Sequence, residues 1–138
     1  MPIFNETVIR QKFDKHLQNS EFKILKWFFI HHKRHFKLIA RVWYEEISVA
    51  DTKRKILFLQ FAHDLIQAGH KMGLYQLEEE FTMYLFRAFE LVEQNIKVRD
   101  DLIKMLHHWE NRGLYKSEII TIKMDFLHLN NESGNFIL

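Results

Sequence analysis

The chain has 138 residues, of which 47% are hydrophobic and 14% aromatic, with 20 Lys and Arg against 18 Asp and Glu and no Cys. This length and composition favour one domain with a packed core and exclude a disordered segment. The lack of Cys excludes thiol catalysis, disulfide scaffolds and cysteine-ligated zinc sites. A net charge of only +2 predicts modest nonspecific affinity for nucleic acids.

Apolar residues recur at helical spacing along the whole chain. The first predicted helix is capped by Asn5 and runs to Leu17. Ser20 can cap a second helix, whose apolar residues are Ile24, Trp27, Phe28 and Ile30. A third helix is predicted over about residues 37–47, with a core face of Ile39, Val42 and Trp43.

The next two predicted helices carry the largest apolar content. The fourth, over about residues 52–68, is apolar on most sides and should lie in the middle of the fold, with Gly69 and Gly73 ending it. The fifth, over about residues 74–94, begins with three consecutive Glu at 78–80. The residues that it should bury are Phe81, Leu85, Ala88, Phe89 and Val92.

A sixth helix is predicted over about residues 98–112, and Gly113 provides the left-handed stop that commonly ends a helix. Its apolar residues are Leu102, Met105, Leu106 and Trp109. A seventh helix should cover about residues 117–129, followed by a frayed tail over residues 130–138. The chain is therefore predicted to form one all-α domain over residues 1–129.

One polar line interrupts the apolar fourth helix. Its members, spaced i, i+3, i+4 and i+7 and so on one side of the helix, are Gln60, His63, Asp64 and Gln67. Because Phe61 and Leu65 flank this line, it could form the floor of a groove. The alternative is that it is simply the outward side of the helix. A buried Asp64 without a partner would be costly, so its carboxylate should face solvent or meet a hydrogen-bond donor.

A second polar line lies on the sixth predicted helix, where Lys104, His108 and Arg112 are spaced i, i+4 and i+8. Such a line can hold a phosphate group, because the Arg112 guanidinium offers a fork of donors and Lys104 a point charge. The alternative is a solvated face on which Asp100 or Asp101 pairs with Lys104.

Neither a metal site nor a catalytic site is predicted. His31 and His35 are spaced i, i+4 and His107 adjoins His108, but tetrahedral zinc needs three or four converging ligands. No His-Glu-x-x-His run, nucleophile–base pair or glycine-rich turn is present in the sequence. We therefore expect a binding protein with no catalytic residue, no metal ion and no cofactor.

Three segments of the chain together form a recognisable pattern. The first is residues 28–35, followed by Ile39 and Val42-Trp43. The second is residues 53–59, continuing through Ala62, Asp64, Ile66-Gln67 and Gly73. The third consists of Leu106, Trp109, Glu110, Arg112 and Tyr115. In this order and with similar spacing, over roughly residues 8–118, they resemble the CTD-interacting domain (CID) of transcription-termination and RNA 3′-end-processing factors.

The resemblance implies a right-handed superhelix of seven or eight helices that binds the phosphorylated C-terminal heptad repeats of RNA polymerase II. It implies that Asp64 accepts a hydrogen bond from the heptad tyrosine, and that Lys104 and Arg112 meet the phosphate. The remaining peptide-binding positions would be Gln60, Phe61, His63, Gln67 and His108. The family often carries arginine at the position of Lys104, and lysine makes a less directional contact with phosphate.

Two alternatives remain open at this point. One is a related VHS- or ENTH-like adaptor that binds cargo peptides or lipid headgroups. The other is an RNA-binding domain that uses the basic runs at residues 33–35 or 53–55. Under the CID interpretation we expect a nuclear protein that acts in transcription termination or RNA 3′-end processing. We expect it to be a monomer that does not associate with membranes.

Overall fold

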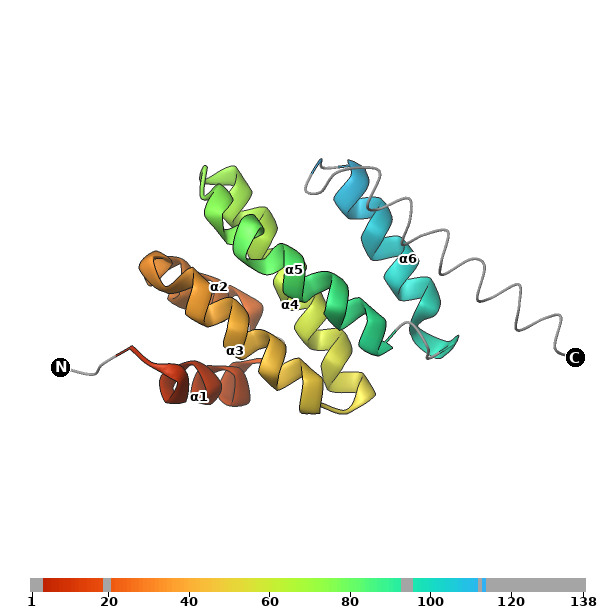
Figure 1. Ribbon diagram of the computed structural model, residues 1–138, viewed down its shortest axis with the longest axis horizontal. Helices are drawn as coiled ribbons and strands as arrows, with labels where there is room; N and C mark the ends of the chain where they lie inside the picture. Colours follow the sequence, from red (N-terminus) through yellow and green to blue (C-terminus); the bar gives the residue numbers. More distant parts are fainter. Residues whose placement is uncertain (1–3, 19–20, 93–95, 112, 114–138) are drawn as a thin grey trace, which may run out of the picture. The chain divides into compact units, whose positions relative to one another are not determined.

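The regular elements of the structure, a computed structural model, are all helical in the part of the chain that it describes, which is residues 4–18, 21–92, 96–111 and 113. They are α1 (Glu6–His16), α2 (Phe22–His31), the 3₁₀ turn η1 (Lys33–His35), α3 (Phe36–Val49), α4 (Thr52–Lys71), α5 (Tyr75–Val92) and α6 (Ile96–Asn111) (Figure 1). The predicted all-α fold class is confirmed. The predicted seventh helix and tail lie outside the described residues.

The chain groups into two compact units, Met1–Ala88 and Phe89–Leu138. In the first unit, α1 packs against α2 and α3, and α4 packs against α2 and α3. Phe13 of α1 lies at the centre of this packing. Its ring centroid is 5.1 Å from that of Phe29, 5.2 Å from that of Phe58 and 5.7 Å from that of Phe61. All four rings are fully buried.

Side-chain capping defines the starts of α1 and α4. The Asn5 side chain accepts a hydrogen bond of 3.1 Å from the backbone N–H of Val8, which confirms the predicted cap of α1. Asp51 does the same for α4, accepting from the N–H of Arg54 at 2.8 Å. Helix α2 begins directly after Glu21, whose side chain makes no capping bond. The predicted cap, Ser20, lies outside the described residues.

The predicted core face of the third helix is confirmed, since Ile39, Val42 and Trp43 of α3 are all fully buried. The Trp43 indole N–H donates a 2.9 Å hydrogen bond to the backbone carbonyl of Phe58 on α4. A buried Trp needs a partner for this donor. The bond therefore fixes α3 against α4 and makes the large side chain compatible with a dry core.

The apolar pattern of the second helix did not identify its buried side. Ile24 and Trp27 are 48% and 58% exposed, whereas Leu25, Phe29 and Ile30 are buried. The prediction listed Ile24 and Trp27 because α2 is apolar over most of its length. Only contacts with α1 and α4 decide which of its apolar residues enter the core.

The predicted end of the fourth helix was wrong at Gly69, which is buried inside α4. A Cβ atom on Gly69 would lie 2.7 Å from Cδ2 of Leu77 on α5, so this glycine allows α5 to pack closely. The turn is made instead by Gly73, whose φ of +75° lies in the left-handed region that glycine adopts readily.

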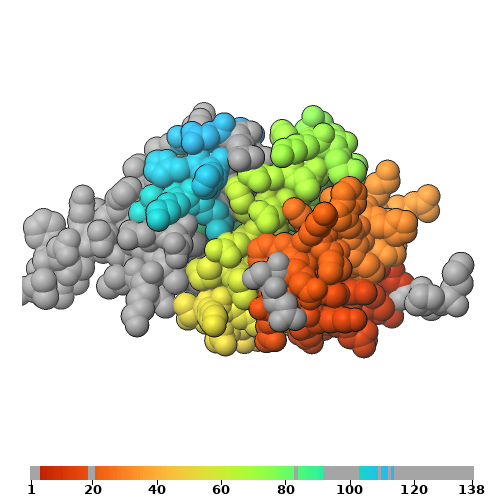
Figure 2. Space-filling view, turned by 180° about the vertical axis from the view of Figure 1, so that it is seen from behind, coloured from red at the N-terminus to blue at the C-terminus, as the bar shows by residue number. Residues whose placement is uncertain are grey.

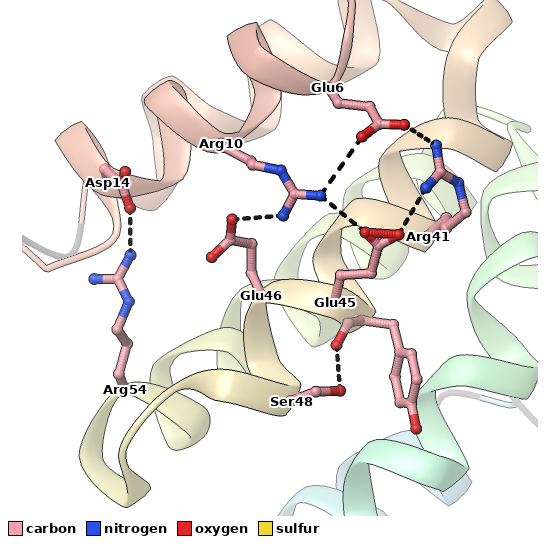
Figure 3. Close-up of polar contacts among 9 residues, drawn as sticks. Glu6, Arg10, Asp14, Arg41, Glu45, Glu46, Ser48 and Arg54 are labelled. Atoms are coloured by element: carbon pink, nitrogen blue, oxygen red, sulfur yellow. Dashed lines mark hydrogen bonds and ion pairs between the residues drawn. The ribbon is translucent and has the colours of Figure 1, made fainter.

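Ion pairs join α1 to α3 on the outside of the first unit (Figure 3). The Arg10 guanidinium lies 2.8 Å from carboxylate oxygens of both Glu45 and Glu46. Arg41 pairs with Glu45 at 2.6 Å and also with Glu6. The hydrogen bond from Arg41 lowers the pKa of Glu6. We call these five residues the α1–α3 ion network.

In the second unit, Met105 and Leu106 of α6 are buried, as predicted, as is Phe89 of α5. Gly113 follows α6 with a φ of +63°, which confirms the predicted left-handed stop. The predicted core residues Val92, Leu102 and Trp109 have side chains outside the described set. Among the helices that the structure describes, none combines the length and apolarity that crossing a membrane requires.

Candidate functional site

The first polar line lies on α4 and reaches the surface along its length. Gln60 is exposed, and His63, Asp64 and Gln67 are partly exposed. Helix α2 packs beside α4, and its orange surface adjoins the yellow-green surface of α4 in Figure 2. The line therefore runs along the side of α4 that is not taken up by the core, where a ligand could contact all four side chains.

Asp64 is the most distinctive of these residues. Its partial burial raises the pKa of the carboxyl, and the ammonium of Lys26 on α2 opposes this shift. Among the residues that the structure describes, no hydrogen bond or ion pair engages the Asp64 carboxylate. A partly dehydrated carboxylate of this kind gains more from a hydrogen-bond donor than one fully in water, because it has already lost part of its hydration.

The two residues expected to flank this line are core residues instead. Phe61 and Leu65 are fully buried. The ring centroid of Phe61 lies 5.6 Å from that of Phe22 and 5.8 Å from that of Phe29. Phe61 was predicted to contact the peptide. This prediction is wrong, because the ring is enclosed in the core and offers no surface to a ligand.

The second polar line lies in the second unit. Lys104 and His108 of α6 are exposed, so their side chains are accessible in the way that contact with a phosphate requires. The third member, Arg112, lies outside the described residues. Met105 and Leu106, between these two, are buried, which confirms that Lys104 and His108 share the polar side of an amphipathic helix.

The two basic runs differ in how their side chains are used. In the run 53–55, Arg54 pairs with Asp14 at 3.2 Å, its guanidinium carbon lies 5.3 Å from the ring centroid of Phe58, and Lys55 donates to the carbonyl of Ala50. In the run 33–35, Lys33 and Arg34 are exposed. The first run is thus largely committed to the fold, and the second is accessible.

Lys26 is the residue near the site that sequence reasoning missed. Its neighbours Leu25 and Trp27 are apolar, so the sequence places it in α2 but does not say which helix it faces. The periodicity of α4 could identify Asp64 because one helix suffices to define a line of side chains. Within the described ranges, no group of three or more His, Asp or Glu side chains could hold a metal ion.

A family model described as "CID domain" matches residues 7–122. The chain is 32% identical over 124 residues to Regulation of nuclear pre-mRNA domain-containing protein 1B of Homo sapiens, covering 87% of this chain and 37% of that protein. It is also 30% identical over 124 residues to Regulation of nuclear pre-mRNA domain-containing protein 1A of Homo sapiens and of Gallus gallus. These matches cover 87% of this chain and 39% and 46% of the two relatives, respectively. The chain thus spans less than half the length of these curated relatives.

Proposed function

Because this chain belongs to the CID domain family, we propose that it is a non-enzymatic module that binds the phosphorylated C-terminal heptad repeats of RNA polymerase II. The observation that carries the proposal is the Asp64 carboxylate: partly buried, on the surface line of α4, and without a hydrogen-bond partner among the described residues. It is suited to accept a hydrogen bond from the hydroxyl group of a tyrosine.

In this proposal the α4 line orients the peptide. Asp64 accepts from the heptad tyrosine, and Gln60, His63 and Gln67 contact the peptide along the same side of the helix. A hydrogen bond to a charged group contributes about 1.5–3 kcal/mol. Since ordering the peptide offsets part of this, we expect affinity near the micromolar range, about −8 kcal/mol.

The polar side of α6 reads the phosphate. Lys104, together with Arg112, neutralises the phosphate on the second serine of the heptad, and His108 contacts the peptide beside it. Lysine acts as a point charge here, so the contact depends on charge more than on direction. The names of the relatives refer to regulation of nuclear pre-mRNA. We accordingly propose that this protein acts in the nucleus, in transcription termination or RNA 3′-end processing.

The test is fluorescence anisotropy with heptad peptides, unphosphorylated and phosphorylated on the second serine. Asp64→Ala should weaken both peptides roughly tenfold or more, because the tyrosine is common to both. Lys104→Ala should instead remove most of the preference for the phosphorylated peptide. A peptide with phenylalanine in place of tyrosine should be insensitive to Asp64→Ala.

Two exposed charges provide matched controls: Glu79→Ala for Asp64→Ala, and Lys71→Ala for Lys104→Ala. Both controls should bind as the unmodified protein does. Equal affinities for all variants and both peptides would show that neither Asp64 nor Lys104 contributes to binding.

A further inference from the structure

The first unit also carries a group of basic side chains away from the α4 line. A hollow of about 370 Å³ is lined by Arg34, His35, Lys37, Leu38, Arg41 and Tyr84. Its volume falls within the range of small-ligand pockets. The residues come from η1, α3 and α5, so the hollow shares no element with the α4 line. Three of the six carry a permanent positive charge, and none of these six is acidic.

The cationic side chains of this hollow differ in whether a carboxylate pairs with them. Arg41 is held by Glu6 and Glu45 (Figure 3), which offset its charge. Arg34 and Lys37 are both exposed, and no ion pair to a described carboxylate engages either of them. Both line the hollow, so it holds two positive charges that no carboxylate of the described residues neutralises. Such a pair attracts phosphate groups.

An aromatic wall accompanies these charges. The Tyr84 ring is stacked on that of Tyr44, with centroids 5.3 Å apart, and this contact holds it at the edge of the hollow. His35 is likewise held by stacking on Phe4, with centroids 4.8 Å apart. Cations that track a phosphate backbone, combined with a held aromatic ring, are the usual components of sites for single-stranded nucleic acid.

We propose that this hollow binds single-stranded RNA, with Arg34 and Lys37 on successive phosphates and Tyr84 against a base. The site is separate from the heptad-binding line and does not depend on that function. The site uses the exposed basic run at residues 33–35. The run at 53–55 is not part of it, and its Arg54 and Lys55 are engaged within the fold.

The experiment is anisotropy of a labelled single-stranded RNA 12-mer with the full chain over a range of salt concentrations. Arg34→Ala combined with Lys37→Ala should weaken binding several-fold. It should also reduce the slope of log affinity against log salt by about 1.4, since each phosphate contact on a single strand contributes about 0.7. Tyr84→Leu should weaken binding roughly tenfold, whereas Tyr84→Phe, which keeps the ring, should not.

The matched control is Lys53→Ala combined with Lys71→Ala, which removes the same charge from exposed positions of α4. If this control lowers affinity and slope as much as the Arg34 and Lys37 pair does, the effect is one of net charge and the proposal is overturned. It is also overturned if the unmodified chain binds anionic vesicles but not RNA, or binds neither. Heptad binding should be unchanged in all these variants, which separates a failure of this proposal from a failure of the proposed function.

Discussion

Trp43 and Trp27 are the same residue type in opposite surroundings. Trp43 is fully buried and bonded to the carbonyl of Phe58, whereas Trp27 is 58% exposed on α2. Sequence periodicity predicted the first correctly, because polar residues on the other side of α3 define its apolar face. It could not resolve the second, because most sides of α2 carry an apolar residue and the choice depends on tertiary contacts.

The first prediction concerns this contrast. Trp43→Phe should lower the free energy of unfolding by about 2 kcal/mol, because it leaves a cavity and removes the bond to Phe58. Trp27→Phe makes the same chemical change at the surface and should alter stability by less than about 0.5 kcal/mol. Urea unfolding of both variants measures the difference. Equal effects would contradict the placement of Trp43 in the core.

The second prediction concerns pH and Asp64. Burial raises the pKa of this carboxyl above its ordinary value of 3.8, so ionised Asp64 destabilises the folded state relative to the protonated form. The protonated carboxyl of Asp64 therefore gives a higher free energy of unfolding than the ionised one. This gain is fully present below pH 3.8 and is lost as pH rises through the folded-state pKa. Asp64→Asn should therefore be more stable than the unmodified protein at pH 7, with a difference that narrows on acidification.

Urea unfolding between pH 7 and pH 4 measures this difference. Glu79→Gln, at an exposed position of α5, is the control. It also removes a carboxylate charge, but from an exposed residue, whereas Asp64 is partly buried. A gain in stability for Asp64→Asn accompanied by weaker heptad binding would identify Asp64 as a residue kept for function at some cost in stability. A loss of stability at pH 7 would contradict the direction of the pKa shift.

At the scale of helices, the sequence predicted the existence and approximate limits of α1 to α6, since capping residues and apolar spacing act locally. Gly69 shows where this reasoning fails. A glycine near the expected end of a helix suggests a stop, but here it is the close approach of Leu77 from the next helix that requires it. A tertiary contact of this kind leaves no signal in the local sequence.

The third prediction tests the α1–α3 ion network. Arg10→Met keeps an unbranched aliphatic stem but removes the pairs with Glu45 and Glu46. It should lower the free energy of unfolding by about 0.5–1 kcal/mol at low salt. The cost should shrink in 1 M NaCl, because these side chains are partly exposed and salt screens them. Urea titrations at both salt concentrations test this. Lys71→Met, at an exposed position of α4, is the control and should show no such dependence.

For the whole molecule, the sequence predicted the fold class, the surface position of the α4 line and the exposure of Lys104 and His108 on α6. It placed Phe61 wrongly among the ligand contacts, because a residue between two members of a surface line can still point into the core. It also did not find Lys26 or the hollow at Tyr84, since both depend on residues that are distant in sequence and adjacent only in the folded chain. Local spacing defines one helix face, and packing defines which faces meet.

The fourth prediction concerns the stability of the complex. Under the proposed function, the phosphorylated heptad peptide binds the native chain and not the unfolded one. At about 100 times its Kd it should then raise the free energy of unfolding by about 2.7 kcal/mol. For a chain of 138 residues this corresponds to an increase in Tm of several degrees. Asp64→Ala should lose most of the increase at the same peptide concentration. Differential scanning calorimetry provides the measurement.

The burial of Trp43 and the exposure of Trp27 have a spectroscopic consequence. A dissolved quencher such as iodide reaches an indole in water and is kept from one enclosed by protein, so the two side chains should differ in how far it diminishes their fluorescence. When α3 separates from α4, Trp43 becomes accessible to the quencher even if both helices persist. Fluorescence quenching can therefore detect loosening of the interior before circular dichroism registers any loss of helix.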